Sequence, residues 1–322
     1  MAARAGVSTA TVSHVVNDNP SARIGEGTRE RVRQAIADLG YRPNIMAKTL
    51  SSGRSQFIGL VADAIATTPF AGEIIRGAQS EAWKRGHVLL VANTDGNSAA
   101  EESAIEMMLE HKVRGILYSS WYHREVAVPE SLAGHDVVLV NCFAADDSAR
   151  SVVPDERQGG RSATEMLIEA GHRRIAFVNT TTASPAREGR MAGYHDAFRS
   201  AGLTVDPALV FDAPPMQEGG YLIAERILGS GATAVFCHND RVAMGLYDYL
   251  RERGLRVPED LAVVGFDNQE VIAAHLHPPL STVGLPHFRL GVEGVRALLD
   301  GPGPDRSPRT AVACPPVVRE SI

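Results

Sequence analysis

Side chains that can bind a small hydroxylated molecule stand where predicted strands end and helices begin. Asp267 closes an apolar strand and Asp155 opens a second series of strands and helices, and either carboxylate could accept two hydroxyl hydrogens. Arg190, near the start of a predicted helix, could donate a forked pair of hydrogen bonds to a hydroxyl or a carboxylate. Asn239 follows another strand and can both donate and accept. These four side chains predict a polar binding site.

Two aromatic residues could add flat surfaces to that site. Phe70 and Trp121 each lie just beyond a predicted strand, where a ring could stack on a sugar or a base. Each assignment has a plainer alternative, because Asp155 and Asp267 could cap helices or hydrogen-bond a crossover, and Trp121 could simply pack. Trp83 lies inside a predicted helix and is expected in the core.

The elements that must position these residues alternate between apolar strands and amphipathic helices from residue 56 onward. Continuous apolar strands of this kind indicate parallel sheets covered by helices on both faces. Two successive series predict two doubly wound domains, whose ligands bind at the carboxyl ends of the strands. The predicted strands are 57–61, 88–92, 115–118, 137–140, 175–178, 234–237 and 262–265, and the predicted helices are 73–85, 100–111, 159–170, 187–201, 219–228 and 242–253.

Residues 5–17 predict a turn followed by a helix with one small polar face. Gly6 permits a tight turn because it has no Cβ, and Ser8 can cap the helix that follows. This is the layout of a helix-turn-helix, whose second helix lies in the DNA major groove, and an ordinary helical hairpin is the alternative. In the second helix Val12, Val15 and Val16 would face a small core, and Thr9, Ala10, Ser13 and His14 would lie on the other side.

A third predicted helix, over 28–39, carries arginines between its apolar positions and ends at Gly40. Residues 1–54 hold eight Lys or Arg against four Asp or Glu, a charge of +4, whereas the whole chain is −6, which leaves −10 for residues 55–322. A basic module on an acidic body suits binding to nucleic-acid phosphates. A solvated basic helix face would explain the arginines but not the turn beside them.

The N-terminal segment resembles the DNA-binding headpiece and hinge helix of the LacI/GalR (lactose-repressor) family of transcription regulators. The resemblance rests on four strings in order: A-G-V-S-T-A-T-V-S at 5–13, T-R-E-R-V at 28–32, G-Y-R-P-N at 40–44 and A-K-T-L at 47–50. The body is similar to periplasmic-binding-protein-like sensor domains through T-P-F at 68–70, G-H-R-R-I at 171–175, A-R-E-G-R-M-A-G-Y at 186–194, N-D at 239–240, V-G-F-D-N at 264–268 and P-P-L-S-T-V at 278–283.

The resemblance implies an all-α helix-turn-helix headpiece plus an α/β periplasmic-binding-protein-like body of two doubly wound parallel-sheet subdomains. Three crossovers are expected near Pro154, near Pro286 and after Leu299. The implied parts are a headpiece at 1–43 with a truncated first helix, a hinge helix and linker at 44–55, a first subdomain at 56–154 plus 286–300, and a second at 155–285 plus 301–322.

The function implied by the resemblance is a sequence-specific, DNA-binding transcriptional regulator, a repressor, whose affinity for DNA is controlled by a small effector. Its expected partners are a pseudo-palindromic double-stranded DNA operator, a second copy of the chain, and a sugar or sugar derivative bound between the subdomains. A sugar phosphate or a nucleoside would suit the acids and the arginine almost equally. The implied effector contacts are Phe70, Trp121, Asp155, Arg190, Asn239 and Asp267.

The DNA contacts implied by the resemblance lie in the headpiece and the hinge. Thr9, Ala10 and His14 are the expected readers of base edges, and Leu50 the residue that wedges into the minor groove. The short hinge helix is expected to fold only when two subunits meet on DNA, because so short a helix is unstable alone. The full set is Ser8, Thr9, Ala10, Thr11, Ser13, His14, Asn17, Arg42, Asn44, Ala47 and Leu50.

Several positions depart from the family pattern. Relatives usually carry Arg where His14 stands, so the base preference is expected to differ. The loop 17–27 is longer than usual, and Gly25 occupies a place where a Ser cap is common. Pro215 falls where relatives often have an aromatic residue, which would thin the stacking wall, and Met1 falls inside the expected first helix.

Other classes of protein find little support. The chain contains no G-x-G-x-x-G after a strand, no Walker loop and no G-x-S-x-G, so neither an enzyme nor a cofactor is expected. His275 and His277 resemble a metal pair but precede prolines, as loops do, and no metal site is expected. No run suits a membrane helix and no leader is evident, which indicates a cytoplasmic protein and disfavours an exported solute-binding protein. The three cysteines, Cys142, Cys237 and Cys314, are expected as buried thiols.

Overall fold

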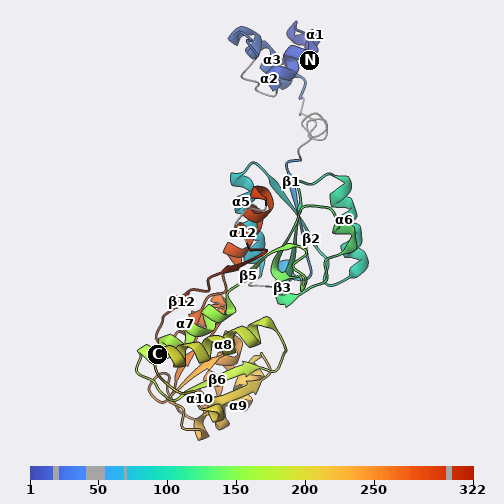
Figure 1. The fold of residues 1–322 in the computed structure, drawn as a ribbon. Coiled ribbons are helices and arrows are strands. Elements are labelled where there is room, and N and C mark those ends of the chain that lie inside the picture. Colours follow the sequence, from blue (N-terminus) through green and yellow to red (C-terminus); the bar gives the residue numbers. More distant parts are fainter. Residues whose placement is uncertain (17–21, 41–54, 69–70, 302–306) are drawn as a thin grey trace. The chain divides into compact units, whose positions relative to one another are not determined.

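The structure of the protein is a computed structural model that describes residues 1–16, 22–40, 55–68, 71–301 and 307–322. The chain divides into two units, Met1–Gln56 and Phe57–Ile322, each with its own core (Figure 1). The predicted run at 45–50 lies outside the described residues.

The first unit is built from three described helices: α1 (Ala2–Ala5), α2 (Thr9–Val16) and α3 (Glu26–Asp38). Gly6 adopts φ 62° between α1 and α2, the left-handed conformation that glycine takes without steric cost. The Oγ atom of Ser8 accepts a hydrogen bond from the Thr11 amide at 3.1 Å, as an N-cap does. Helix α3 begins at Glu26, earlier than predicted, behind Gly25, whose place at the cap supplies no side-chain acceptor. The small core consists of Ala5, Val12, Val15, Val32 and Ala35.

The second unit contains two parallel sheets. The first has the order β11-β5-β4-β3-β1-β2, and residues 58, 60, 138 and 140 point to one face while 61, 116, 137 and 139 point to the other. Helices α5 and α12 cover the first of these faces and α6 the second (Figure 1). The strands are β1 (Phe57–Ala62), β2 (Val88–Asn93), β3 (Ile116–Glu125), β4 (Val137–Phe143), β5 (Arg150–Pro154) and β11 (Arg309–Val312), and the helices are α5 (Gly72–Lys84), α6 (Ser98–Glu110) and α12 (His287–Asp300), with short 3-10 turns at Ile65–Thr67 and Glu130–Leu132.

The second sheet has the order β7-β6-β8-β9, with α7 and α8 packed on one face and α9 and α10 on the other. A small antiparallel pair, β10 with β12, lies beside it. The strands are β6 (Ile175–Thr180), β7 (Val210–Ala213), β8 (Ala234–Cys237), β9 (Ala262–Val264), β10 (Thr282–Val283) and β12 (Pro316–Val317), and the helices are α7 (Glu156–Glu169), α8 (Pro185–Ser200), α9 (Gln217–Gly229), α10 (Asp240–Glu252) and α11 (Glu270–Ala273), with a 3-10 turn at Pro207–Leu209.

The chain passes between the two sheets three times within the described residues. It leaves the first sheet after β5, returns between β10 and α12, and leaves again between β11 and β12. The expected boundary at residue 301 is wrong, because Arg309 to Val312 pair in register with Ser151 to Pro154 of β5. The third crossover therefore follows Val312, and β11 belongs to the first subdomain.

Glycine lets neighbouring helices approach closely in both subdomains. A Cβ at Gly77 in α5 would overlap the carbonyl oxygen of Phe288 in α12, and one at Gly193 in α8 would overlap backbone atoms of Arg157 and Arg161 in α7. The same relationship joins α9 to α10 through Gly220 and Gly245. Each helix pair is thus packed backbone against backbone, where no larger side chain fits.

Two expectations about single residues meet different outcomes. The three cysteines are fully buried and unpaired with one another, as predicted. Trp83 is not in the core, because its side chain is 64% exposed. Helix α5 buries Ile74, Ala78 and Ala82, and Trp83 lies one position beyond that stripe.

Candidate functional site

A cavity of about 350 Å³ lies between the two subdomains and is lined by residues of both. Parallel strands end at this place in each sheet, which is where ligands of such sheets bind. The first subdomain contributes Trp121, Tyr122, His123 and Asn141. The second contributes Glu156, Thr180, Arg190, Pro215, His238, Asn239, Arg241, Asp267 and Gln269, among others.

Arg190 is the centre of the charged groups in the cavity. Its side chain is buried, its Nε donates to Glu156 Oε2 at 2.9 Å, and its Nη2 lies 3.7 Å from Asp267 Oδ1. The guanidinium also lies over the Phe266 ring, 3.6 Å from its centroid, and donates to the carbonyl oxygen of His238. Arg190 therefore joins α8 to the start of α7 and to the ends of β8 and β9.

Glu156, at the first position of α7, carries a buried negative charge. Burial alone would raise its pKa, but the charge of Arg190 and the nearby His123 outweigh burial and lower the pKa to about 2. His123 Nδ1 lies 3.5 Å from Glu156 Oε1, so the two side chains face each other from different subdomains. This contact couples β3 to α7 across the cavity.

Asp267 sits at a tight turn just after β9, with φ 102°. Its carboxylate accepts a hydrogen bond from Gln269 Nε2 at 3.0 Å. Burial raises the pKa of Asp267 to about 6, against the opposing effects of Arg190 and Gln269. The side chain is thus poised between its neutral and charged forms near neutral pH.

Two of the expected residues spend their polar groups on the backbone. Asn239 lines the cavity, but it caps α10 by accepting from the Val242 amide at 2.9 Å and donates to the Pro215 carbonyl at 3.0 Å. Asp155 does not line the cavity: it caps α7 by accepting from the Gln158 amide at 2.9 Å. The expectation of a direct contact by Asp155 is corrected here, because the chain turns from β5 into α7 and brings Glu156 to the cavity instead.

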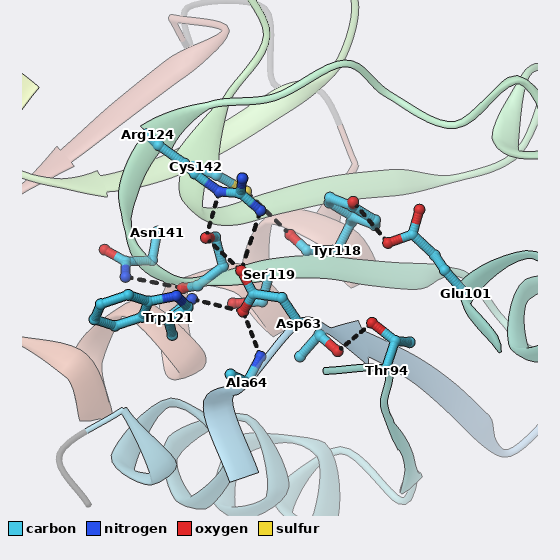
Figure 2. A network of polar contacts seen from close by, with 12 residues as sticks. Asp63, Ala64, Thr94, Glu101, Tyr118, Ser119, Trp121, Arg124, Asn141 and Cys142 are labelled. Atoms are coloured by element: carbon cyan, nitrogen blue, oxygen red, sulfur yellow. Dashed lines mark hydrogen bonds and ion pairs between the residues drawn. The ribbon is translucent and has the colours of Figure 1, made fainter. Parts of the chain in front are cut away.

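A polar network fixes the aromatic wall of the cavity (Figure 2). The Asp63 carboxylate accepts from the Trp121 amide at 2.9 Å and from Arg124 Nη2 at 3.1 Å, and Ser120 Oγ donates to it at 2.9 Å. Trp121 lies within β3 and not beyond a strand end, at a break in the register between Ser119 and Arg124. The indole makes an edge contact with Tyr122, so the two rings form one surface. Phe70 lies outside the described residues.

The cavity also contains residues that were not expected from the sequence. Glu156 and His238 each adjoin an expected residue, at the end of a strand or the start of a helix, and that position was the signal that could have found them. His123 and Asn141 follow apolar strands whose length the sequence underestimates. Across the described ranges, no group of three or more His, Cys, Asp or Glu is arranged to hold a metal ion.

In the first unit, helix α2 presents a small polar surface. Ser8, Thr9 and Ala10 are exposed, as are Ser13 and His14, whereas Val12 and Val15 are buried. The hydroxyls of Ser8 and Thr11 are hydrogen-bonded to each other at 2.9 Å. The other expected DNA contacts, Asn17, Arg42, Asn44, Ala47 and Leu50, lie outside the described residues.

Known proteins resemble both parts of the chain. Residues 1–44 match the model for bacterial regulatory proteins of the lacI family, and residues 164–322 match that for a periplasmic binding protein-like domain. The chain is 33% identical to the ribose operon repressor of Haemophilus influenzae over 99% of its own length and 96% of that protein's. It belongs to the lacI family. This LacI-family protein is a transcriptional repressor, of a kind for which effector binding is typical.

Solved structures of LacI-family regulators agree with this assignment. The complex of the transcriptional regulator CelR with cellobiose is 32% identical and superimposes with a TM-score of 0.67, covering 99% of this chain and 98% of that one. The lac repressor dimer bound to operator and the anti-inducer ONPF is 26% identical, with a TM-score of 0.77 and coverage of 99% and 97%. LacI-family regulators bind DNA operators and small effectors such as sugars, and they dimerise. None of the helices in the described part of this chain has both the length and the apolar character needed to span a bilayer.

Proposed function

We propose that this LacI-family repressor binds a pseudo-palindromic operator as a homodimer, and that a sugar or sugar derivative in the cavity between the subdomains controls its affinity for DNA. The observation that carries the proposal is the cavity itself. Its two walls come from different subdomains and supply carboxylates, amides and two adjoining aromatic rings. Sugars present hydroxyls to acceptors and flat C–H faces to rings, so this lining suits them.

On the DNA side, α2 is the proposed reading helix. Its exposed face is small enough to enter a major groove, and Thr9, Ala10 and His14 are the proposed contacts with base edges. Arg42 and Asn44 are proposed to contact the backbone, Ala47 and Leu50 the minor groove. The net charge of +4 on residues 1–54 against −10 on the remainder directs DNA to this end of the chain.

On the effector side, Glu156 and Asp267 are the proposed acceptors for ligand hydroxyls, and Trp121 with Tyr122 the proposed stacking surface. Phe70 keeps its proposed place as a second aromatic contact. Arg190 and Asn239 act mainly by holding the cavity in shape, because their polar groups already bind Glu156, His238 and the backbone.

The coupling follows from the position of the cavity. A ligand that touches both walls changes the relative angle of the subdomains, and this changes the spacing of the two headpieces in a dimer. Such coupling is reciprocal, so operator must alter the affinity for effector by the same factor as effector alters the affinity for operator.

The test begins with selection of random DNA duplexes by the purified full chain at two salt concentrations. The expected result is an inverted repeat that is bound more weakly at the higher salt concentration. Operator binding is then measured with and without a panel of sugars, sugar phosphates and nucleosides. Enrichment of no sequence would contradict the DNA-binding half of the proposal, and a response to nucleosides alone would contradict the sugar half.

A further inference from the structure

Two histidine rings face the cavity from opposite subdomains with a buried nitrogen that makes no hydrogen bond to any described residue. One is His123 on β3, whose Nδ1 lies near Glu156 but is not directed at it for a hydrogen bond. The other is His238, which follows β8 and is 6% exposed. Both residues line the cavity.

A buried polar atom without a partner costs free energy, so each is a place where a partner is expected. An imidazole nitrogen can donate or accept according to its tautomer, and a hydroxyl can do the same. A ligand with several hydroxyls can therefore satisfy both rings at once, whichever tautomer each adopts.

The charges in the cavity limit what that ligand can carry. The lining contains two carboxylates, Glu156 and Asp267, and two arginines, Arg190 and Arg241, so with the histidines counted as neutral its charges cancel. Arg190 is held by Glu156 and by the His238 carbonyl, and Arg241 contacts the sulfur of Met216 and acts electrostatically on Asp267. A phosphate ester would add two negative charges beside two carboxylates without a matching cation. Burial makes such an imbalance costly.

We propose that the effector is a neutral polyhydroxylated molecule, and that His123 and His238 are specificity-determining residues that each hydrogen-bond one of its hydroxyls. This rests on the proposed function and narrows it, since it excludes phosphorylated sugars. It also explains how a ligand draws the subdomains together, because the two hydrogen bonds are made by different subdomains.

The test measures binding of neutral sugars, their phosphate esters and nucleosides to the full chain, by calorimetry and by the shift in thermal unfolding. The expected result is a neutral sugar that binds at least 10-fold more tightly than its own phosphate ester. His123→Phe, which keeps the ring and removes its nitrogens, and His238→Ala should each weaken that sugar about 10-fold, the loss of one hydrogen bond to a neutral group. His238→Asn, whose amide lies close to the place of Nδ1, should restore part of the affinity.

The control is His275→Ala, which alters an exposed histidine outside the cavity and should leave affinity unchanged. A folded His123→Phe variant that binds the sugar as tightly as the parent chain overturns the inference even if His238→Ala does not fold. A phosphate ester that binds as well as the free sugar also overturns it, while the proposed sugar function survives both results. If no sugar of either kind binds, the proposed function itself fails.

Discussion

Arg190 and Glu156 form a buried ion pair, with Arg190 Nε 2.9 Å from Glu156 Oε2 and each side chain only 4% exposed. Each charge makes the other tolerable in the interior. The pair also connects α8 to the first turn of α7, next to the crossover at Pro154. The cavity wall of the second subdomain therefore depends on this pair for its shape.

Removing one partner of that pair should destabilise the protein strongly. Arg190→Met keeps an apolar stem and leaves Glu156 charged and buried, so we expect a loss of about 3–5 kcal/mol in the free energy of unfolding. Denaturant unfolding measures it. The matched control is Arg251→Ala, which breaks a pair with Asp248 whose arginine is 80% exposed and should cost less than about 1 kcal/mol. Equal losses in the two variants would mean that the buried pair has no special role.

Asp267 should make stability depend on pH. Its pKa in the folded protein is raised to about 6, above the ordinary 3.8. Between these values the folded protein holds a proton that the unfolded chain has released, so the Asp267 contribution to stability falls as pH rises from about 4 to about 6. Asp267→Asn removes this contribution, and the variant should gain stability relative to the parent chain over that window. Unfolding of both proteins at pH 4.5 and pH 7 measures the change, and a difference that stays constant between the two pH values would contradict it.

The close packing of α7 on α8 should not tolerate a methyl group. Gly193→Ala would force a Cβ into the backbone of α7 at Arg157 and Arg161, and we expect a loss of about 1–3 kcal/mol. The control is Gly229→Ala at the end of α9, where a Cβ meets no atom within 4 Å and stability should change by less than about 1 kcal/mol. Thermal unfolding of the two variants compares them directly. A Gly193→Ala protein as stable as its control would show that the helices move apart at little cost.

His14 should affect which operator is preferred more than how binding depends on salt. If its ring contacts a base edge, His14→Ala should weaken the selected operator by about 1–3 kcal/mol and relax the preference at one base pair. A neutral side chain releases no counterion, so the slope of affinity against salt should stay the same. Gln34→Ala, an exposed change on α3, serves as the control. Uniform weakening across all duplexes, with a shallower slope, would assign His14 to a phosphate instead.

Most of the body fold could be predicted because its strands are apolar and its helices amphipathic, as at β6 and α10. The short strands β5, β7 and β11 could not. Strand β11 follows a segment rich in Gly and Pro and is not continuously apolar, and its partner β5 is far away in the sequence. Its place depends on a pairing that local pattern does not record. Trp83 was misplaced for a related reason, because helical periodicity does not say which stripe meets the sheet.

The site was predictable by region and less so by residue. Sequence reasoning found Arg190 and Asp267, which stand at a helix start and a strand end. It chose Asp155 where Glu156 faces the cavity, because one residue of a helix start differs from the next by about 100° in direction. The contributions of His123 and His238 depend on burial and on the absence of other partners, which only the folded arrangement reveals.

The position of β11 also has a consequence for synthesis of the chain. The first sheet lacks its outer strand, and one of its covering helices, α12, until the last residues leave the ribosome. The first unit and the second sheet's main strands are complete much earlier. A chain that stops before residue 309 would leave β5 as an open edge able to pair with another molecule. Premature termination near the 3′ end of the message is therefore expected to yield aggregates instead of a shortened repressor.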